Sequence, residues 1–157
     1  MDTARDIAIK IKIIKNIFDQ AVNRAVGPVG LTAAQSLMLQ HIARASGGSV
    51  FQRDMENTFG LKHPTVTGIV NRLESKKLII CTTDDRDKRR KRIAPTDRGL
   101  RLTDEIRGDM DRTGENLLRG FSAEETALLS GLLDRMIRNT PHDLCPPCGF
   151  CGKEETK

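Results

Sequence analysis

The chain has 157 residues but neither tryptophan nor tyrosine, and only five phenylalanines supply aromatic rings. So few rings do not form the stacking platforms on which single-stranded nucleic acids bind. No apolar run approaches the ~18 residues of a membrane span. The first eight residues lack the charged, apolar and small-residue order of an export signal. We therefore expect a cytoplasmic protein, and a hydrophobic content of 38% is enough for a globular core.

Cysteine is scarce as well, with four residues in the whole chain. Without an export signal, four cysteines do not indicate a disulfide framework. Common catalytic patterns are also missing: the sequence has no Ser/His/Asp spacing, no glycine-rich phosphate loop and no His-Glu-x-x-His motif. We therefore expect that the protein is not an enzyme.

Positive charge is present, and it is concentrated in one stretch. The net charge is +5, but residues 60–101 hold twelve of the 26 Lys and Arg residues and only five of the 21 acidic ones. That stretch therefore carries +7, and the rest of the chain carries −2. A local basic surface of this kind is typical of proteins that bind nucleic acid, although it does not by itself establish such a partner.

Hydrophobic periodicity and helix-end signals predict mainly helices. Capping boxes, in which Ser or Thr precedes Gln or Glu by three residues, begin at Thr32, Ser49 and Ser122. Gly60 is typical of a helix end, and Pro64 of a helix start. The predicted elements are helices over 5–26, 32–45 and 49–60, a helix from 63, strands over 78–83 and 90–95, a long helix from 96, and a final helix from 122 to 140.

A helix-turn-helix followed by a basic hairpin is a winged helix. The predicted fold is mainly α with a small β-hairpin wing, in which a winged helix-turn-helix lobe joins a helical dimerisation region built from the N- and C-terminal helices. The major groove of duplex DNA admits one α-helix, whose N-terminus also favours phosphate oxygens. Basic hairpin residues neutralise neighbouring phosphates. The pattern therefore predicts double-stranded DNA as a partner.

Two motifs resemble those of a known family. Lys62 to Ile79, KHPTVTGIVNRLESKKLI, is similar to the recognition helix of MarR-type transcriptional regulators. Asp87-Lys88-Arg89-Arg90, shortly before Thr96-Asp97-Arg98-Gly99, resembles the wing signature and next helix of that family. The resemblance covers about residues 5–140. It implies a homodimer on a pseudo-palindromic operator, usually a repressor, which is released by a small aromatic effector or by thiol oxidation.

The resemblance also implies site residues and shows two departures. The family arginine that matches Arg89 lies in the minor groove, held by the aspartate that matches Asp87. Gly68 stands where many members carry a larger polar side chain, and Lys77 stands where a glycine commonly ends the recognition helix. The candidate DNA-binding residues are Lys62, His63, Pro64, Thr65, Thr67, Gly68, Asn71, Arg72, Arg86, Lys88, Arg89 and Arg90. Among these, Thr65, Thr67, Asn71 and Arg72 are the expected groove-facing side chains.

The predicted domain organisation has two parts. Residues 1–141 form the MarR-like domain, with a DNA-binding lobe at about 32–96 and dimerisation helices at about 5–26 and 97–140. Their apolar stripes are wider than one small core needs, which favours a two-fold dimer. Residues 142–157 form a cysteine-containing tail. The effector and its binding residues cannot be named from the sequence.

The tail and two isolated residues offer alternatives. His142, Cys145, Cys148 and Cys151 recur every third residue, a spacing that suits a zinc or iron site, a redox-active pair, or incidental thiols. Cys81 is expected to be a small buried residue, with a sensing thiol as the alternative, and His41 to be a packed histidine.

Two other functions remain open at this point. One is a winged-helix module that binds protein or RNA. The other is a dedicated metal or thiol sensor that uses the tail.

Overall fold

A computed structural model describes residues 3–45, 49–85, 87–88 and 90–140 of the protein. The chain divides into two units, residues 1–116 and residues 117–157, each with its own internal packing. No helix within the described ranges is long and apolar enough to cross a membrane.

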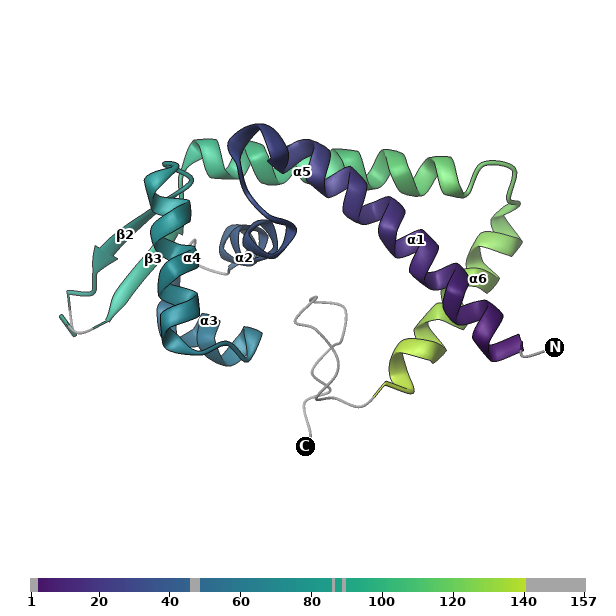
Figure 1. Ribbon diagram of the computed structural model, residues 1–157, viewed down its shortest axis with the longest axis horizontal. Coiled ribbons are helices and arrows are strands. Elements are labelled where there is room, and N and C mark those ends of the chain that lie inside the picture. Colours follow the sequence, from purple (N-terminus) through teal and green to yellow (C-terminus); the bar gives the residue numbers. More distant parts are fainter. Residues whose placement is uncertain (1–2, 46–48, 86, 89, 141–157) are drawn as a thin grey trace. The chain divides into compact units, whose positions relative to one another are not determined.

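The first unit holds most of the helices and the sheet, and Figure 1 shows α2, α3 and α4 grouped beside the β2–β3 hairpin. Its helices follow the predicted order, with one additional short 3₁₀ turn. In chain order the elements are α1 (Thr3–Val26), η1 (Gly27–Val29), α2 (Ala33–Arg44), β1 (Val50–Phe51), α3 (Gln52–Phe59), α4 (His63–Ser75), β2 (Ile79–Thr83), β3 (Lys91–Pro95) and α5 (Asp97–Leu117).

The core of this unit lies where α2, α4 and the sheet meet. Each of these helices buries one apolar stripe, as their periodicity predicts. Ile93 from β3 and Leu102 and Ile106 from α5 close the same cluster. The buried residues of the cluster are Val26, Leu31, Met38, Leu39, Ile42, Met55, Val66, Val70, Leu73, Leu78, Ile79, Ile93, Leu102 and Ile106.

Helix ends confirm most of the capping predictions. Thr32 caps α2 through a capping box with Gln35, and Ser122 does the same for the final helix with Glu125. Gly60 ends α3 in the left-handed conformation, with φ of 60°. The capping box at Ser49 is wrong: Phe51 is the N-cap of α3, and its side chain makes no capping hydrogen bond.

That error has a tertiary cause. Val50 and Phe51 form the short strand β1, which pairs antiparallel with Ile93 and Arg92 of β3. The sheet therefore has three strands in the order β1-β3-β2, where the sequence predicts only a hairpin. Pairing with a strand about forty residues away overrides the local signal for a helix start.

The second unit contributes α6 (Ala123–Arg138), which buries no residue within that unit's described part. Leu128 is 64% exposed, Leu132, Leu133, Met136 and Ile137 are exposed too, and Leu129 is partly buried. The observed elements confirm the predicted fold class: mainly helical, with a small wing of three antiparallel strands.

His41 is packed as expected, since its ring lies edge-on to Phe59 with centroids 5.3 Å apart.

Candidate nucleic-acid interface

One face of α4 is polar and exposed, and the other is buried. Val66, Val70 and Leu73 pack into the core, so the opposite side of the helix lies in solvent. Because helix neighbours recur at steps of three and four, the exposed positions form one continuous face. The exposed candidates on this helix are His63, Pro64, Thr65, Gly68, Asn71 and Arg72.

The first turn of α4 favours the binding of an anion. Lys62 is the N-cap, and its carbonyl accepts hydrogen bonds from the N–H groups of Thr65 (3.0 Å) and Val66 (3.2 Å). Pro64 occupies the first turn, where its missing N–H costs nothing. The remaining N–H groups and the positive end of the helix dipole favour a phosphate oxygen here.

Two of the candidate DNA-binding side chains, one of them expected to face the groove, are held by α3. Gln52 Nε2 donates a hydrogen bond of 2.7 Å to Thr67 Oγ1. His63 Nδ1 donates to Glu56 Oε1 at 2.6 Å. Gln52 is only 9% exposed, and its Nε2 also lies 3.4 Å from His63 Nδ1. Thr67 and His63 therefore tie α4 to α3, and Thr65 and Asn71 remain on the exposed face.

Arg72 makes a long-range contact that the sequence does not reveal. Its Nη2 donates a hydrogen bond of 3.1 Å to the carbonyl oxygen of Gly30, at the corner between η1 and α2. Gly30 has a φ of 65°, a left-handed conformation that favours glycine. Arg72 thus braces the end of α4 against the corner that follows α1.

The wing hairpin is organised by Asp84. This residue is 7% exposed, and its carboxylate accepts a hydrogen bond of 3.0 Å from Arg92 Nη2. Its other oxygen accepts the N–H of Asp87 at 3.2 Å, and its own N–H donates to the carbonyl of Arg90. Lys88 is exposed at the turn. Of the predicted wing contacts, Arg86 and Arg89 lie outside the described residues.

Arg90 stacks on an aromatic ring that was not among the predicted site residues. Its guanidinium carbon lies 3.7 Å from the centroid of the Phe51 ring, and that of Arg92 lies 5.4 Å away. The only local signal for Phe51 is a β-branched and aromatic pair, Val50-Phe51, which is typical of a strand. Its contact with the wing depends on β1 pairing with β3.

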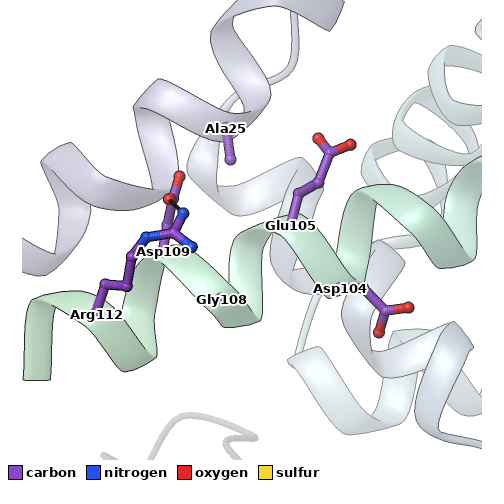
Figure 2. A pocket seen from close by; sticks show the side chains of 6 residues that line it. All are labelled: Ala25, Asp104, Glu105, Gly108, Asp109 and Arg112. Carbon is purple, nitrogen blue, oxygen red and sulfur yellow. Dashed lines mark hydrogen bonds and ion pairs between the residues drawn. The ribbon is translucent and has the colours of Figure 1, made fainter. Parts of the chain in front are cut away.

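The first unit also has two hollows. One of about 860 Å³ lies beside the wing and is lined by Phe51, Thr82, Thr83, Asp84, Asp85, Asp87, Arg90 and Arg92. The other, of about 530 Å³, lies between Ala25 of α1 and residues of α5 (Figure 2). In the second hollow Asp109 pairs with Arg112, and Asp104 pairs with Arg107 at 2.7 Å. These charges therefore have partners on their own helix.

Cys81 is half-buried against the core, close to the prediction. Its N–H donates to Glu74 Oε1 at 3.2 Å. Burial, and then the negative charge of Glu74, raise the pKa of the Cys81 thiol to about 11. Since the thiolate is the reactive form, the raised pKa disfavours reaction of the Cys81 thiol at neutral pH.

The predicted metal ligands lie in the C-terminal tail, after residue 140. Across residues 3–45, 49–85, 87–88 and 90–140, no group of three or more His, Cys, Asp or Glu residues is arranged to hold a metal ion. His142, Cys145, Cys148 and Cys151 lie outside the described residues.

Comparisons with known proteins agree with this geometry. A MarR family model matches residues 29–90, which span α2, β1, α3, α4 and β2 and end just before β3. An uncharacterised HTH-type transcriptional regulator of Bacillus subtilis, YybA, is 27% identical over 138 residues, which is 88% of this chain and 91% of that protein.

Solved structures are similar over a comparable length. The crystal structure of MarR has a TM-score of 0.67 and 25% identity, and the match covers 82% of this chain and 86% of that one. A mutant of MepR from S. aureus, bound to an oligodeoxyribonucleotide, has a TM-score of 0.64 and 26% identity over 83% of this chain and 95% of its own.

Sequence, fold and relatives therefore agree. The expectation that the protein is not an enzyme agrees with a family of regulators. From the recognition-helix and wing motifs, the three-stranded wing and these matches, the chain is similar to the MarR family of winged helix-turn-helix transcriptional regulators.

Proposed function

We propose that the protein binds a pseudo-palindromic double-stranded DNA operator as a homodimer and represses transcription from it. The observation that carries this proposal is the exposed polar face of α4 beside a basic hairpin in one small unit. α4 enters the major groove, with Thr65 and Asn71 toward base edges and the helix start toward a phosphate. The wing follows the neighbouring backbone through Lys88 and Arg90, and through Arg86 and Arg89 beyond the described residues.

A relative supports the choice of DNA as partner. The mutant of MepR that matches most of this chain was solved with an oligodeoxyribonucleotide bound. The scarcity of aromatic rings argues against single-stranded partners. A winged helix that binds protein or RNA is the alternative, and it differs in showing no sequence-specific affinity for duplexes.

Exposed apolar faces support the homodimer. α1 carries six exposed isoleucines between Ile7 and Ile17, and Ile9 and Ile13 are 51% and 53% exposed. Monomeric proteins rarely leave so much contiguous apolar surface in water. A two-fold partner that covers these helices would set its two recognition helices about one DNA turn, roughly 34 Å, apart.

The test is selection of bound fragments from genomic DNA, followed by fluorescence anisotropy on the selected duplex. The proposal expects a specific complex at least ~1,000-fold tighter than random duplex. Affinity should also fall steeply with salt, because Lys and Arg displace counterions. Equal affinity for RNA, or no preference among duplexes, would contradict it.

Two asparagines make a matched pair for this assay. Asn71 is exposed on α4 and Asn23 is exposed on α1. Asn71→Ala should lose about 1–3 kcal/mol on the selected duplex and discriminate less against base changes at one position. Asn23→Ala should bind as the wild type does. Equal losses in both variants would indicate general destabilisation rather than groove contact.

Repression and its release are the finer part of the proposal. A reporter gene placed behind the selected operator should be silenced by the wild type and expressed with Asn71→Ala. The release signal is a small organic effector or a metal or thiol signal. Activation of the reporter by the wild type would show the opposite regulatory sign.

The tail favours a second function, metal sensing. His142, Cys145, Cys148 and Cys151 supply four ligands that suit zinc or iron, from one chain or shared with a partner. Elemental mass spectrometry on tag-free protein purified without oxygen should find stoichiometric metal, which Cys148→Ser removes. Metal-free protein that binds the operator unchanged would leave the tail as redox-active or incidental thiols.

A further inference from the structure

Two adjacent residues at the junction of β1 and α3 reach the two halves of the proposed interface. Phe51 ends β1, and its ring carries the guanidinium of Arg90 at 3.7 Å. Gln52 begins α3, and its amide donates to Thr67 of α4 at 2.7 Å. One peptide bond therefore joins a contact with the wing to a contact with the recognition helix.

The Phe51 contact orients a cation without burying it. Arg90 is exposed, while one face of its planar group lies on the ring. Its N–H groups point outward from the edge of that plane, so they stay available to a phosphate oxygen. The strand beneath is fixed, because Phe51 pairs with Arg92 across β1 and β3, and Arg92 binds Asp84.

The Gln52 contact fixes a helix. Gln52 is 9% exposed and lies at the first position of α3, so its own place is set by that helix. Thr67 lies in the second turn of α4, one step from the exposed face that holds Gly68 and Asn71. The hydrogen bond therefore holds the rotation of α4 about its axis.

We propose that the Phe51–Gln52 junction sets the position of the recognition helix relative to the wing. Phe51 is a positioning residue that presents Arg90 to a DNA phosphate. Gln52 is a positioning residue that holds the α4 face toward the base edges. This inference rests on the proposed binding of duplex DNA, and it assigns the two halves of the interface to neighbouring residues with separable effects.

The first test compares Phe51→Leu with Phe51→Tyr in anisotropy titrations on the selected operator at several salt concentrations. Leucine keeps an apolar strand residue but removes the ring, and tyrosine keeps the ring. Phe51→Leu should bind about three- to tenfold more weakly and lower the salt slope by about one, the signature of one lost phosphate contact. Phe51→Tyr should match the wild type in both. A variant that is merely destabilised loses active protein without changing that slope.

The second test uses Gln52→Met, which keeps the length of the side chain and removes its amide. Here the salt slope should stay unchanged, and the affinity ratio of operator to random duplex should fall about tenfold or more, as expected when a base contact is misplaced. Thr67→Val should give the same loss, and the double variant should lose no more than either single one.

The outcomes separate the two proposals. If Phe51→Leu fails to fold, Arg90→Gln gives the same salt-slope test from the other partner of the contact. A wild-type salt slope and wild-type affinity in Phe51→Leu, or in Arg90→Gln where it replaces that variant, would overturn the inference while the proposed function stands. A wild-type chain that binds no duplex would overturn both.

Discussion

The lobe built from α2, α3, α4 and the sheet differs from the helices at the two ends of the chain in where apolar residues lie. In the lobe, Leu73, Leu78 and Ile93 are fully buried, and the exposed large apolar residues are Leu37 on α2 and Ile80 on β2. In α1, exposed isoleucines recur from Ile7 to Ile17, and α6 buries none of its residues. The lobe buries its apolar residues within one chain, whereas the exposed apolar residues of the end helices are what the proposed homodimer would cover.

The largest expected effect comes from placing a charge in the α1 stripe. Ile13→Glu should convert the dimer to a monomer, because a carboxylate buried in an apolar interface is strongly disfavoured. Losing the second recognition helix should weaken operator binding by about 100-fold or more. Light scattering after size exclusion measures the mass, and anisotropy measures the affinity.

Ile80 provides the matched control, since it is 53% exposed, as is Ile13. Ile80→Glu places the same charge on an exposed apolar residue of the lobe and should leave the mass unchanged. If both variants keep the wild-type mass, or if both lose it, the distinction between lobe and end helices fails.

A second variant tests how tightly the lobe is closed. Gly99 is buried in the first turn of α5, and a Cβ placed there would lie 2.1 Å from the carbonyl oxygen of Leu78. That oxygen also accepts the N–H of Thr96 at 3.0 Å, so the backbone has little freedom to move. Gly99→Ala should lower the free energy of unfolding by about 3 kcal/mol, at the upper end of overpacking effects. Urea titration measures the loss.

Gly68→Ala is the control for this variant, because nothing lies within 4 Å of its Cβ position on α4. A helix-interior alanine there should raise the free energy of unfolding by roughly 0.5–1 kcal/mol. A comparable loss at both positions would mean that the close approach at Gly99 does not limit packing.

The reaction rate of the Cys81 thiol also measures how tightly the lobe is packed. Burial and Glu74 raise its pKa to about 11 from 9.0. Folding therefore favours the protonated thiol. That contribution to stability is complete below pH 9 and is lost as the pH rises toward 11. At pH 8 the Cys81 thiol of the folded protein should react with iodoacetamide about 100-fold more slowly than an ordinary cysteine, as the ratio of thiolate fractions predicts.

A chain in which Cys145, Cys148 and Cys151 are replaced by Ser isolates this reaction. Unfolding that variant in urea should restore the ordinary rate. Glu74→Gln in the folded protein should increase it, because one cause of the raised pKa is removed. A fast reaction of the folded triple-Ser variant with Glu74 intact would instead make Cys81 a sensing thiol.

Sequence predicts those features that depend on neighbouring residues. The Thr32 and Ser122 capping boxes, the αL end at Gly60 and the buried stripe of α4 all follow from spacings of three or four residues. The contacts it misses join distant segments. Phe51 meets Arg92 through strand pairing, and Arg72 reaches Gly30 across 42 positions. Local patterns carry no information about such pairs.

The same distinction applies to the candidate site. The sequence selects α4 and the hairpin, but it does not separate exposed Thr65 from Thr67, which binds Gln52. Both are polar residues near the start of the helix, two positions apart. Only the packing of α3 against α4 decides which one is held inside the fold.

The smallest expected effect is at the end of α4, where this chain departs from the MarR-type pattern that it resembles. Lys77 has a φ of 58°, and it stands at the C′ position of a Schellman motif. Its N–H donates to the carbonyl oxygen of Glu74 at 2.8 Å, and the N–H of Leu78 donates to the carbonyl oxygen of Leu73 at 3.0 Å. A left-handed conformation costs a residue with a side chain about 1–2 kcal/mol, and glycine avoids this cost but loses more chain entropy on folding. Lys77→Gly should therefore raise the free energy of unfolding by about 0.5–1 kcal/mol.

Lys77→Ala separates the backbone conformation from the charge. It removes the same positive charge from a basic stretch but keeps a Cβ at a φ of 58°. Thermal and urea unfolding should show a gain for glycine and none for alanine, since only glycine relieves the backbone. An equal gain in both variants would assign the effect to charge repulsion near Lys76, and the strain at this helix end would then contribute nothing to the stability of the lobe.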